Sequence, residues 1–196
     1  MKKILIVLFL ILFTLPAFAE DDELYYFKKL DNYISKYQKE LILNQNNKNA
    51  AFYNLQKEYE NIVFEMNTKN INKISQLQCT NYNGRYSITS DNRDNKIKVQ
   101  KYYNKGVKLY CSEAMSIFIV DYNWLKKNHG SGLTKEYNEW LKYLSNPVSF
   151  EEGTLNTDKR TLNMQITKLE KFIYSYPNFI GIEDVKKELN KLKEAR

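Results

Sequence analysis

The chain has 196 residues, of which 43% are hydrophobic and 14% aromatic, and its formal net charge is +7. This content of core-forming side chains excludes a wholly disordered chain, and six Gly with three Pro exclude a collagen-like or linker composition. The length suits one globular domain.

The first 19 residues have the parts of a secretory signal peptide. Lys2 and Lys3 provide a positive start, residues 4–15 form an apolar stretch, and Ala17-Phe18-Ala19 fits the small-x-small rule for cleavage. This stretch is too short to cross a bilayer before the acidic residues 20–23 begin. We therefore expect a signal peptide over 1–19, export to the periplasm or the medium, and no stable membrane span after cleavage.

Cleavage also changes the charge of the chain. Loss of Lys2 and Lys3 from 30 basic side chains leaves 28 against 23 acids, a balance of +5. The excess is modest, and an exported protein seldom meets nucleic acid. We expect no nucleic-acid partner.

Two cysteines, Cys79 and Cys111, remain in the exported chain. Thiols oxidise in the compartments that exported proteins enter, and neither cysteine belongs to a C-x-x-C pair or lies beside His129 in the sequence. We predict that Cys79 and Cys111 form a disulfide.

Apolar residues at steps of three and four predict helices along most of the chain. The first pattern begins at Leu24, and Pro177 ends the fifth. The patterns span 24–41, 51–66, 122–128, 133–144, 162–176 and 182–192, with a short apolar piece at 71–77. Short breaks between such helices imply antiparallel neighbours.

The middle of the chain has a different pattern. Alternation over Val107, Leu109 and Cys111, followed by the β-branched run 117–120, predicts a β-hairpin that turns at 112–114. Residues 96–104 fit a strand or a helix, and we favour a helix that ends at Gly106. The expected fold is mainly α, an antiparallel bundle of helical hairpins with a small β-hairpin near 107–120, in one domain over 20–196.

The last helix pair contains the junction Tyr174-Ser175-Tyr176-Pro177 between two amphipathic stretches. Residues 165–195 resemble the helix-YP-helix unit of tetratricopeptide-like repeats in bacterial envelope proteins. The resemblance implies a helical hairpin, protein binding rather than catalysis, and a structural turn at Tyr176-Pro177.

No motif in the sequence indicates a reaction. His129 is the only histidine, beside Gly130-Ser131-Gly132, and we interpret it as a surface-turn residue because no G-x-S-x-G, H-E-x-x-H or P-loop motif accompanies it. We interpret the acidic pairs 151–152 and 183–184 as solvated or capping residues. We predict no catalytic residue, no metal site and no cofactor.

The positive charge of the exported chain is concentrated in residues 93–108. Tyr102 and Tyr103 lie within this stretch, and Asp94 is its only acid. Its basic residues are candidate anion-binding residues: Arg93, Lys96, Lys98, Lys101, Lys105 and Lys108. The simpler interpretation of the same pattern is that these basic side chains form a surface face that is solvated by water and binds no anion.

Together these features predict a non-catalytic binding or structural component of the bacterial cell envelope. The expected partner is an envelope protein or an anionic envelope polymer. The alternative is a secreted hydrolase that cleaves cell-wall glycan with a pair of carboxylates.

Overall fold

The computed structural model describes residues 22–43, 47–69, 79–82, 85–88, 100–111, 116–145 and 159–196. Within these ranges the protein is mainly helical, with two antiparallel β-hairpins, which confirms the predicted fold class. The predicted signal peptide, the apolar piece 71–77 and the acidic pair 151–152 lie outside the described residues. So do Arg93, Lys96 and Lys98.

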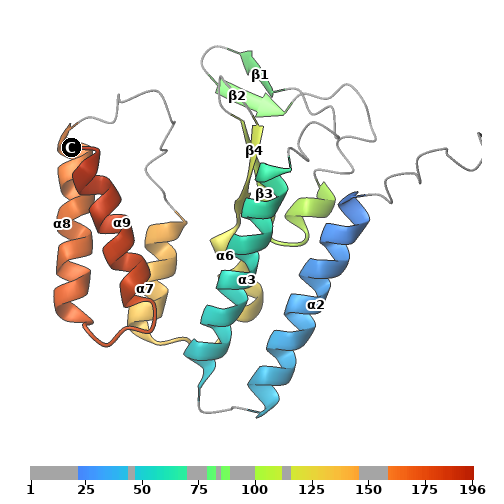
Figure 1. Cartoon of the computed structure of the whole chain (residues 1–196), viewed down its shortest axis with the longest axis horizontal. Helices are drawn as coiled ribbons and strands as arrows, with labels where there is room; N and C mark the ends of the chain where they lie inside the picture. The colour runs from blue at the N-terminus through green and yellow to red at the C-terminus, as the bar shows by residue number, and fades with distance from the viewer. Residues whose placement is uncertain are drawn as a thin grey trace, which may run out of the picture.

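The first two predicted helices are present and form an antiparallel pair. Helix α2 (Asp22–Leu43) lies against α3 (Lys48–Thr68), as Figure 1 shows. Helix α3 begins after Asn47, whose side chain accepts a hydrogen bond from the backbone nitrogen of Ala50 at 3.3 Å. The apolar positions predicted for this helix are buried, namely Ala51, Leu55, Tyr59, Ile62 and Met66.

The predicted hairpin is also present. Strand β3 (Val107–Cys111) pairs with β4 (Ser116–Val120), with Val107 opposite Val120. The side chain of Asn67 on α3 holds the free edge of β4, because its amide donates to the carbonyl of Phe118 and accepts from the nitrogen of Phe118, both at 2.8 Å. The hairpin is therefore attached to α3 by hydrogen bonds as well as by packing.

A second hairpin was not expected from the sequence. Strand β1 (Cys79–Tyr82) pairs with β2 (Arg85–Ile88), and β2 lies next to β3. Strands of four residues are too short to give a clear alternation.

Residues 100–103 are helical, so the strand alternative is wrong for this part of 96–104. The helical conformation buries Tyr102, whose ring packs against Phe27 at 4.7 Å and Phe118 at 4.9 Å between centroids. A strand would have placed Tyr103 and Lys101 on one face and Tyr102 on the other. The turn ends at Gly106, as predicted, with a φ of +78°.

Four further helices complete the fold. Helix α6 (Tyr122–His129) starts at Asp121, whose side chain accepts from the nitrogen of Trp124 at 3.1 Å, and α7 (Lys135–Leu144) follows a short connection. Helices α8 (Lys159–Ser175) and α9 (Ile182–Glu194) form the predicted hairpin. Figure 1 places α7, α8 and α9 on one side of α3 and α2 on the other.

The side of the molecule that carries α7, α8 and α9 has an aromatic core. The ring of Tyr137 makes edge-to-face contacts with Phe52 of α3 and Phe179 of the α8–α9 turn, at 5.3 and 5.4 Å between centroids. Phe179 also contacts Phe172, with the ring centroids 5.3 Å apart.

Among the described helices, none is long and apolar enough to span a membrane.

Replacing Gly106 with Ala should destabilise the fold. The residue has a positive φ, and an added Cβ would lie 2.5 Å from Cε3 of Trp124. Backbone strain and overpacking together should lower the free energy of unfolding by about 2–4 kcal/mol, measured by urea denaturation. Gly132→Ala is the matched control, since Gly132 has a φ of +79° but faces the flexible end of Lys48. Equal losses in both variants would contradict the role assigned to Trp124.

Candidate functional site

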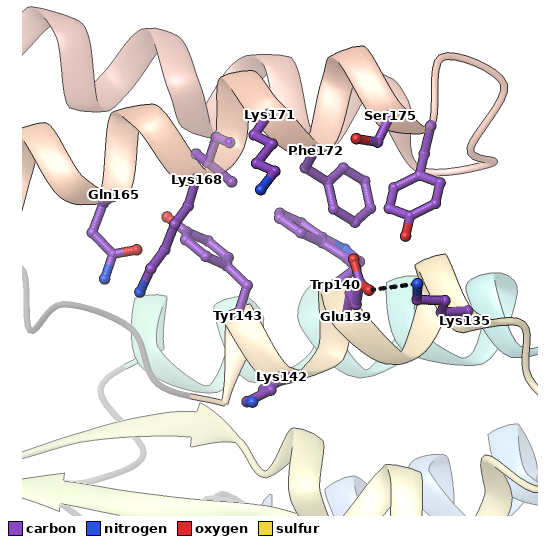
Figure 2. Close-up of a pocket in the computed structure, with 12 residues that line it drawn as sticks. Lys135, Glu139, Trp140, Lys142, Tyr143, Gln165, Lys168, Lys171, Phe172 and Ser175 are labelled. Atoms are coloured by element: carbon purple, nitrogen blue, oxygen red, sulfur yellow. Dashed lines mark ion pairs between the residues drawn. The ribbon is translucent and has the colours of Figure 1, made fainter.

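The candidate site is a groove between α7 and α8 that encloses about 610 Å³. Figure 2 shows the side chains that reach into it from the two helices. We call it the α7–α8 groove. Its lining residues are Lys135, Glu139, Trp140, Lys142, Tyr143, Gln165, Lys168, Leu169, Lys171, Phe172, Ser175 and Tyr176.

The floor of the groove is aromatic. Trp140 stacks on Tyr143 one helical turn further along α7, with ring centroids 5.3 Å apart and planes 7° apart. Phe172 of α8 lies 6.2 Å from Trp140 between centroids, with the two rings inclined at 48° and next to each other in Figure 2. Because Trp140 and Phe172 also contact Phe179, the floor is part of the aromatic core and is held in position by it.

The rim of the groove is cationic. Lys168 and Lys171 come from α8 and Lys135 comes from α7, whereas the side chain of Lys142, also on α7, points away from α8 in Figure 2. Glu139 is the only acidic residue in the lining. Glu139 lies 3.9 Å from Lys135. Lys168 and Lys171 form no ion pair within the described part of the chain. The groove therefore presents a positive potential to a ligand.

Two polar atoms in the lining are buried without a hydrogen-bond partner among the described residues. They are Nε1 of Trp140, which is 2% exposed, and Oε1 of Gln165, which is 8% exposed. Buried polar groups in proteins are nearly always hydrogen-bonded, and each unmade bond costs about 1–3 kcal/mol. One donor, Trp140 Nε1, and one acceptor, Gln165 Oε1, are therefore buried in the wall of the groove without a partner among the described residues.

Tyr143 connects the groove to a second pocket. Burial raises the pKa of its phenol, and a hydrogen bond to Glu188 raises it further, so the hydroxyl stays protonated and donates.

The second pocket encloses about 410 Å³ between α3, β4 and α9, beside Phe64, which is 70% exposed. It collects three carboxylates, from Glu60, Asp121 and Glu188.

Each carboxylate of the second pocket has a structural partner. Glu60 accepts from the amide of Gln56 at 2.8 Å and from the hydroxyl of Tyr122 at 3.1 Å. Asp121 caps α6 and pairs with Lys108 at 3.0 Å. These contacts hold the helices and the hairpin together. These three carboxylates are not arranged to hold a metal ion together, and no other group of three or more His, Cys, Asp or Glu side chains within the described ranges is either.

The predicted anion-binding stretch is described only from residue 100 onward. Lys101 is exposed on the helical turn, Lys105 pairs with Asp31 of α2, and Lys108 pairs with Asp121. Two of the three described lysines therefore neutralise carboxylates of this chain. Anion binding by the whole stretch stays a prediction.

The predicted disulfide also stays a prediction. Cys79 begins β1 and Cys111 ends β3, and their side chains lie outside the described ones. The backbone of β2 lies next to β3, which brings the two hairpins together.

His129 is not the surface-turn residue that the sequence suggested. It is the last residue of α6, and its ring is half-buried, 5.8 Å from the ring of Tyr37 and 5.4 Å from that of Trp124. Nε2 is buried without a partner among the described residues, while the backbone carbonyl accepts from the hydroxyl of Tyr37 at 2.6 Å. The prediction was wrong because α2 covers the end of α6, which no local pattern reveals.

Of the acidic pair 183–184, only Glu183 is solvated as expected: its side chain is 73% exposed and pairs with Lys186 at 2.7 Å. The expectation was wrong for Asp184, which is 19% exposed and accepts from Lys57 and from the hydroxyl of Tyr53 on α3, both at 2.8 Å. The groove lysines were missed by the sequence analysis. The sequence shows that Lys168 and Lys171 are three residues apart and that Lys135 and Lys142 are seven apart. It does not show which face of α7 meets which face of α8.

No family model, no curated protein and no solved structure matches this chain. The assignment of a function therefore depends on the two pockets themselves.

Stability should fall between about pH 7 and pH 5 through His129. Burial lowers the pKa of its imidazole below the ordinary 6.5, so the unfolded state binds the proton more readily and the folded state loses stability as the pH drops through the unfolded pKa. His129 is the only histidine. His129→Phe should therefore remove this slope, measured by urea denaturation across the range. An unchanged slope in the variant would contradict the assignment.

Proposed function

We propose that this protein is a non-catalytic binding component of the bacterial cell envelope and that the α7–α8 groove holds an anionic ligand. One observation carries the proposal: the groove is lined by lysines with Glu139 as its only acid, and Lys168 and Lys171 form no ion pair among the described residues. Surface lysines alone are usually solvated. Two buried atoms of the same lining, Trp140 Nε1 and Gln165 Oε1, have no hydrogen-bond partner among the described residues, which adds to the support for a ligand.

The proposed location follows from the N-terminus. Lys2, Lys3 and the apolar stretch before Ala19 have the pattern of a secretory signal. The partner would then be an envelope protein or an anionic envelope polymer. The resemblance of residues 165–195 to a tetratricopeptide-like unit supports binding rather than catalysis.

Neutralising the rim should weaken anion binding. Lys168→Gln with Lys171→Gln should raise the Kd for a polyanion about tenfold, since two partly solvated ion pairs contribute up to ~1 kcal/mol each. The probes are fluorescein-labelled polyglutamate, polygalacturonate and polyphosphate, measured by anisotropy at low and physiological salt. Binding of at least one probe should weaken as salt rises.

The matched control is Lys28→Gln with Lys39→Gln, two exposed lysines of α2 that make the same change in net charge. Equal weakening by the groove pair and the control pair would mean that binding depends on net charge only. That result, or the absence of binding to all three probes, would overturn the proposed function.

A second candidate function is hydrolysis of cell-wall glycan, favoured by the three carboxylates of the second pocket. We expect no such activity, because structural contacts occupy Glu60 and Asp121. The purified exported form should release no soluble fragments from peptidoglycan. Release that persists in Glu194→Gln, an exposed control, but is lost in Glu188→Gln would establish the hydrolase instead.

A further inference from the structure

We infer that one end of the molecule docks on the surface of an anionic lipid bilayer. We call it the docking end, and it consists of the last turn of α2, the first turn of α3, the α6–α7 connection and the α8–α9 turn. Figure 1 shows the ends of α2 and α3 that meet here, and the α8–α9 turn, on its lower side. The inference goes beyond the proposed function and does not depend on a ligand in the α7–α8 groove.

Hydrogen bonds and ring contacts bring these segments together. The side chain of Asn49 on α3 donates to the hydroxyl of Thr134 at 3.0 Å and accepts from its backbone nitrogen at 3.3 Å, just before α7 begins. Tyr37 of α2 donates to the backbone carbonyl of His129 at the end of α6. Phe179 of the α8–α9 turn packs its ring on α7. Segments that are far apart in the sequence therefore meet at one end of the molecule.

The docking end exposes large apolar side chains. Ile42 and Leu43, the last two residues of α2, are 73% and 80% exposed. Tyr174 at the end of α8 is 88% exposed, and Ile180 in the α8–α9 turn is 43% exposed. Single exposed apolar residues are ordinary on a protein surface, but a group of them at one end indicates a contact surface.

The docking end also carries unpaired positive charge. Lys48 opens α3, and Lys126 and Lys127 lie in the last turn of α6. All three are exposed, and none forms an ion pair with another residue in the described part of the chain, whereas Glu40 and Glu136 at this end are less exposed. An anionic leaflet attracts such lysines, because their long side chains reach the phosphate groups while the backbone stays outside.

The combination of these groups selects a bilayer over a protein partner. The apolar side chains are exposed at the ends of elements and line neither of the two pockets, so a partner must receive them rather than insert between them. A bilayer interface adapts to such a surface and provides acyl chains next to anionic phosphates. Tyr174 suits this depth because its ring is apolar and its hydroxyl is polar. Docking here leaves the β1–β2 hairpin, at the opposite end in Figure 1, directed away from the bilayer.

The test is co-sedimentation of the full exported chain with vesicles. The chain should bind vesicles of equimolar phosphatidylglycerol and phosphatidylcholine, bind phosphatidylcholine alone more weakly, and lose affinity for the mixed vesicles as salt rises. Failure to bind the mixed vesicles would overturn the inference and leave the proposed function of the groove standing. Without vesicles the chain should sediment as a monomer. A dimer that Ile42→Ser with Leu43→Ser dissociates would assign the surface to a second copy and overturn the lipid assignment.

Paired apolar variants separate docking from general adhesion. Ile42→Ser with Leu43→Ser should lower the vesicle partition coefficient about tenfold, because two inserted apolar side chains are lost. The matched control is Phe64→Ser with Met164→Ser, which removes two exposed apolar side chains far from the docking end along α3 and α8. Both pairs should keep the melting temperature of the unchanged chain. Equal weakening of vesicle binding by the two pairs would contradict the inference.

Paired charge variants test the lysines of the same end. Lys126→Gln with Lys127→Gln should weaken binding to the mixed vesicles about tenfold and leave binding to phosphatidylcholine unchanged. The matched control is Lys28→Gln with Lys159→Gln, exposed lysines near the opposite ends of α2 and α8 that make the same change in net charge. An equal loss in this control would show that binding follows net charge only, which would overturn the docking end.

Discussion

The placement of α7 and α9 against α3 depends on a polar cluster centred on the buried Gln56 of α3. Gln56 is 1% exposed, and its oxygen accepts from the hydroxyl of Tyr137 at 2.8 Å while its nitrogen donates to Glu60 at 2.8 Å. Lys57 then joins Glu60 at 2.7 Å to Asp184 at 2.8 Å. A single helix is thereby bonded to α7 and α9. Because a buried polar group without a partner is costly, the hydrogen bond between Tyr137 and Gln56 favours this placement of α7 on α3.

The raised pKa values of the tyrosine hydroxyls keep them protonated, so that they go on donating hydrogen bonds in this cluster. Burial raises the pKa of Tyr53 to about 12, and its hydrogen bond to Asp184 adds to the shift. Burial likewise raises the pKa values of Tyr137 and Tyr122 well above their ordinary range, with nearby carboxylates contributing. These hydroxyls therefore remain donors at any physiological pH. The cluster behaves as a fixed set of hydrogen bonds, which suits a binding protein with a rigid site.

The groove is a consequence of this fixed placement. Tyr137 faces α3 through Gln56 and Phe52, and Trp140, one turn later and displaced by about 60° around α7, packs against Phe172 of α8. The floor of the groove is therefore as rigid as the core. Lys168 and Lys171, in contrast, are exposed on α8.

Sequence periodicity alone determined the positions of the six long helices and of the β3–β4 hairpin, because repeats of three and four or of two residues reflect which side of a local element is buried. It also placed the turn at Gly106 correctly. Tertiary structure decided the rest. The helical form of residues 100–103 depends on Phe27 and Phe118 receiving Tyr102, and the burial of His129 depends on α2. The groove depends on which faces of α7 and α8 meet, and that choice is made by contacts to α3 that lie far away in the sequence.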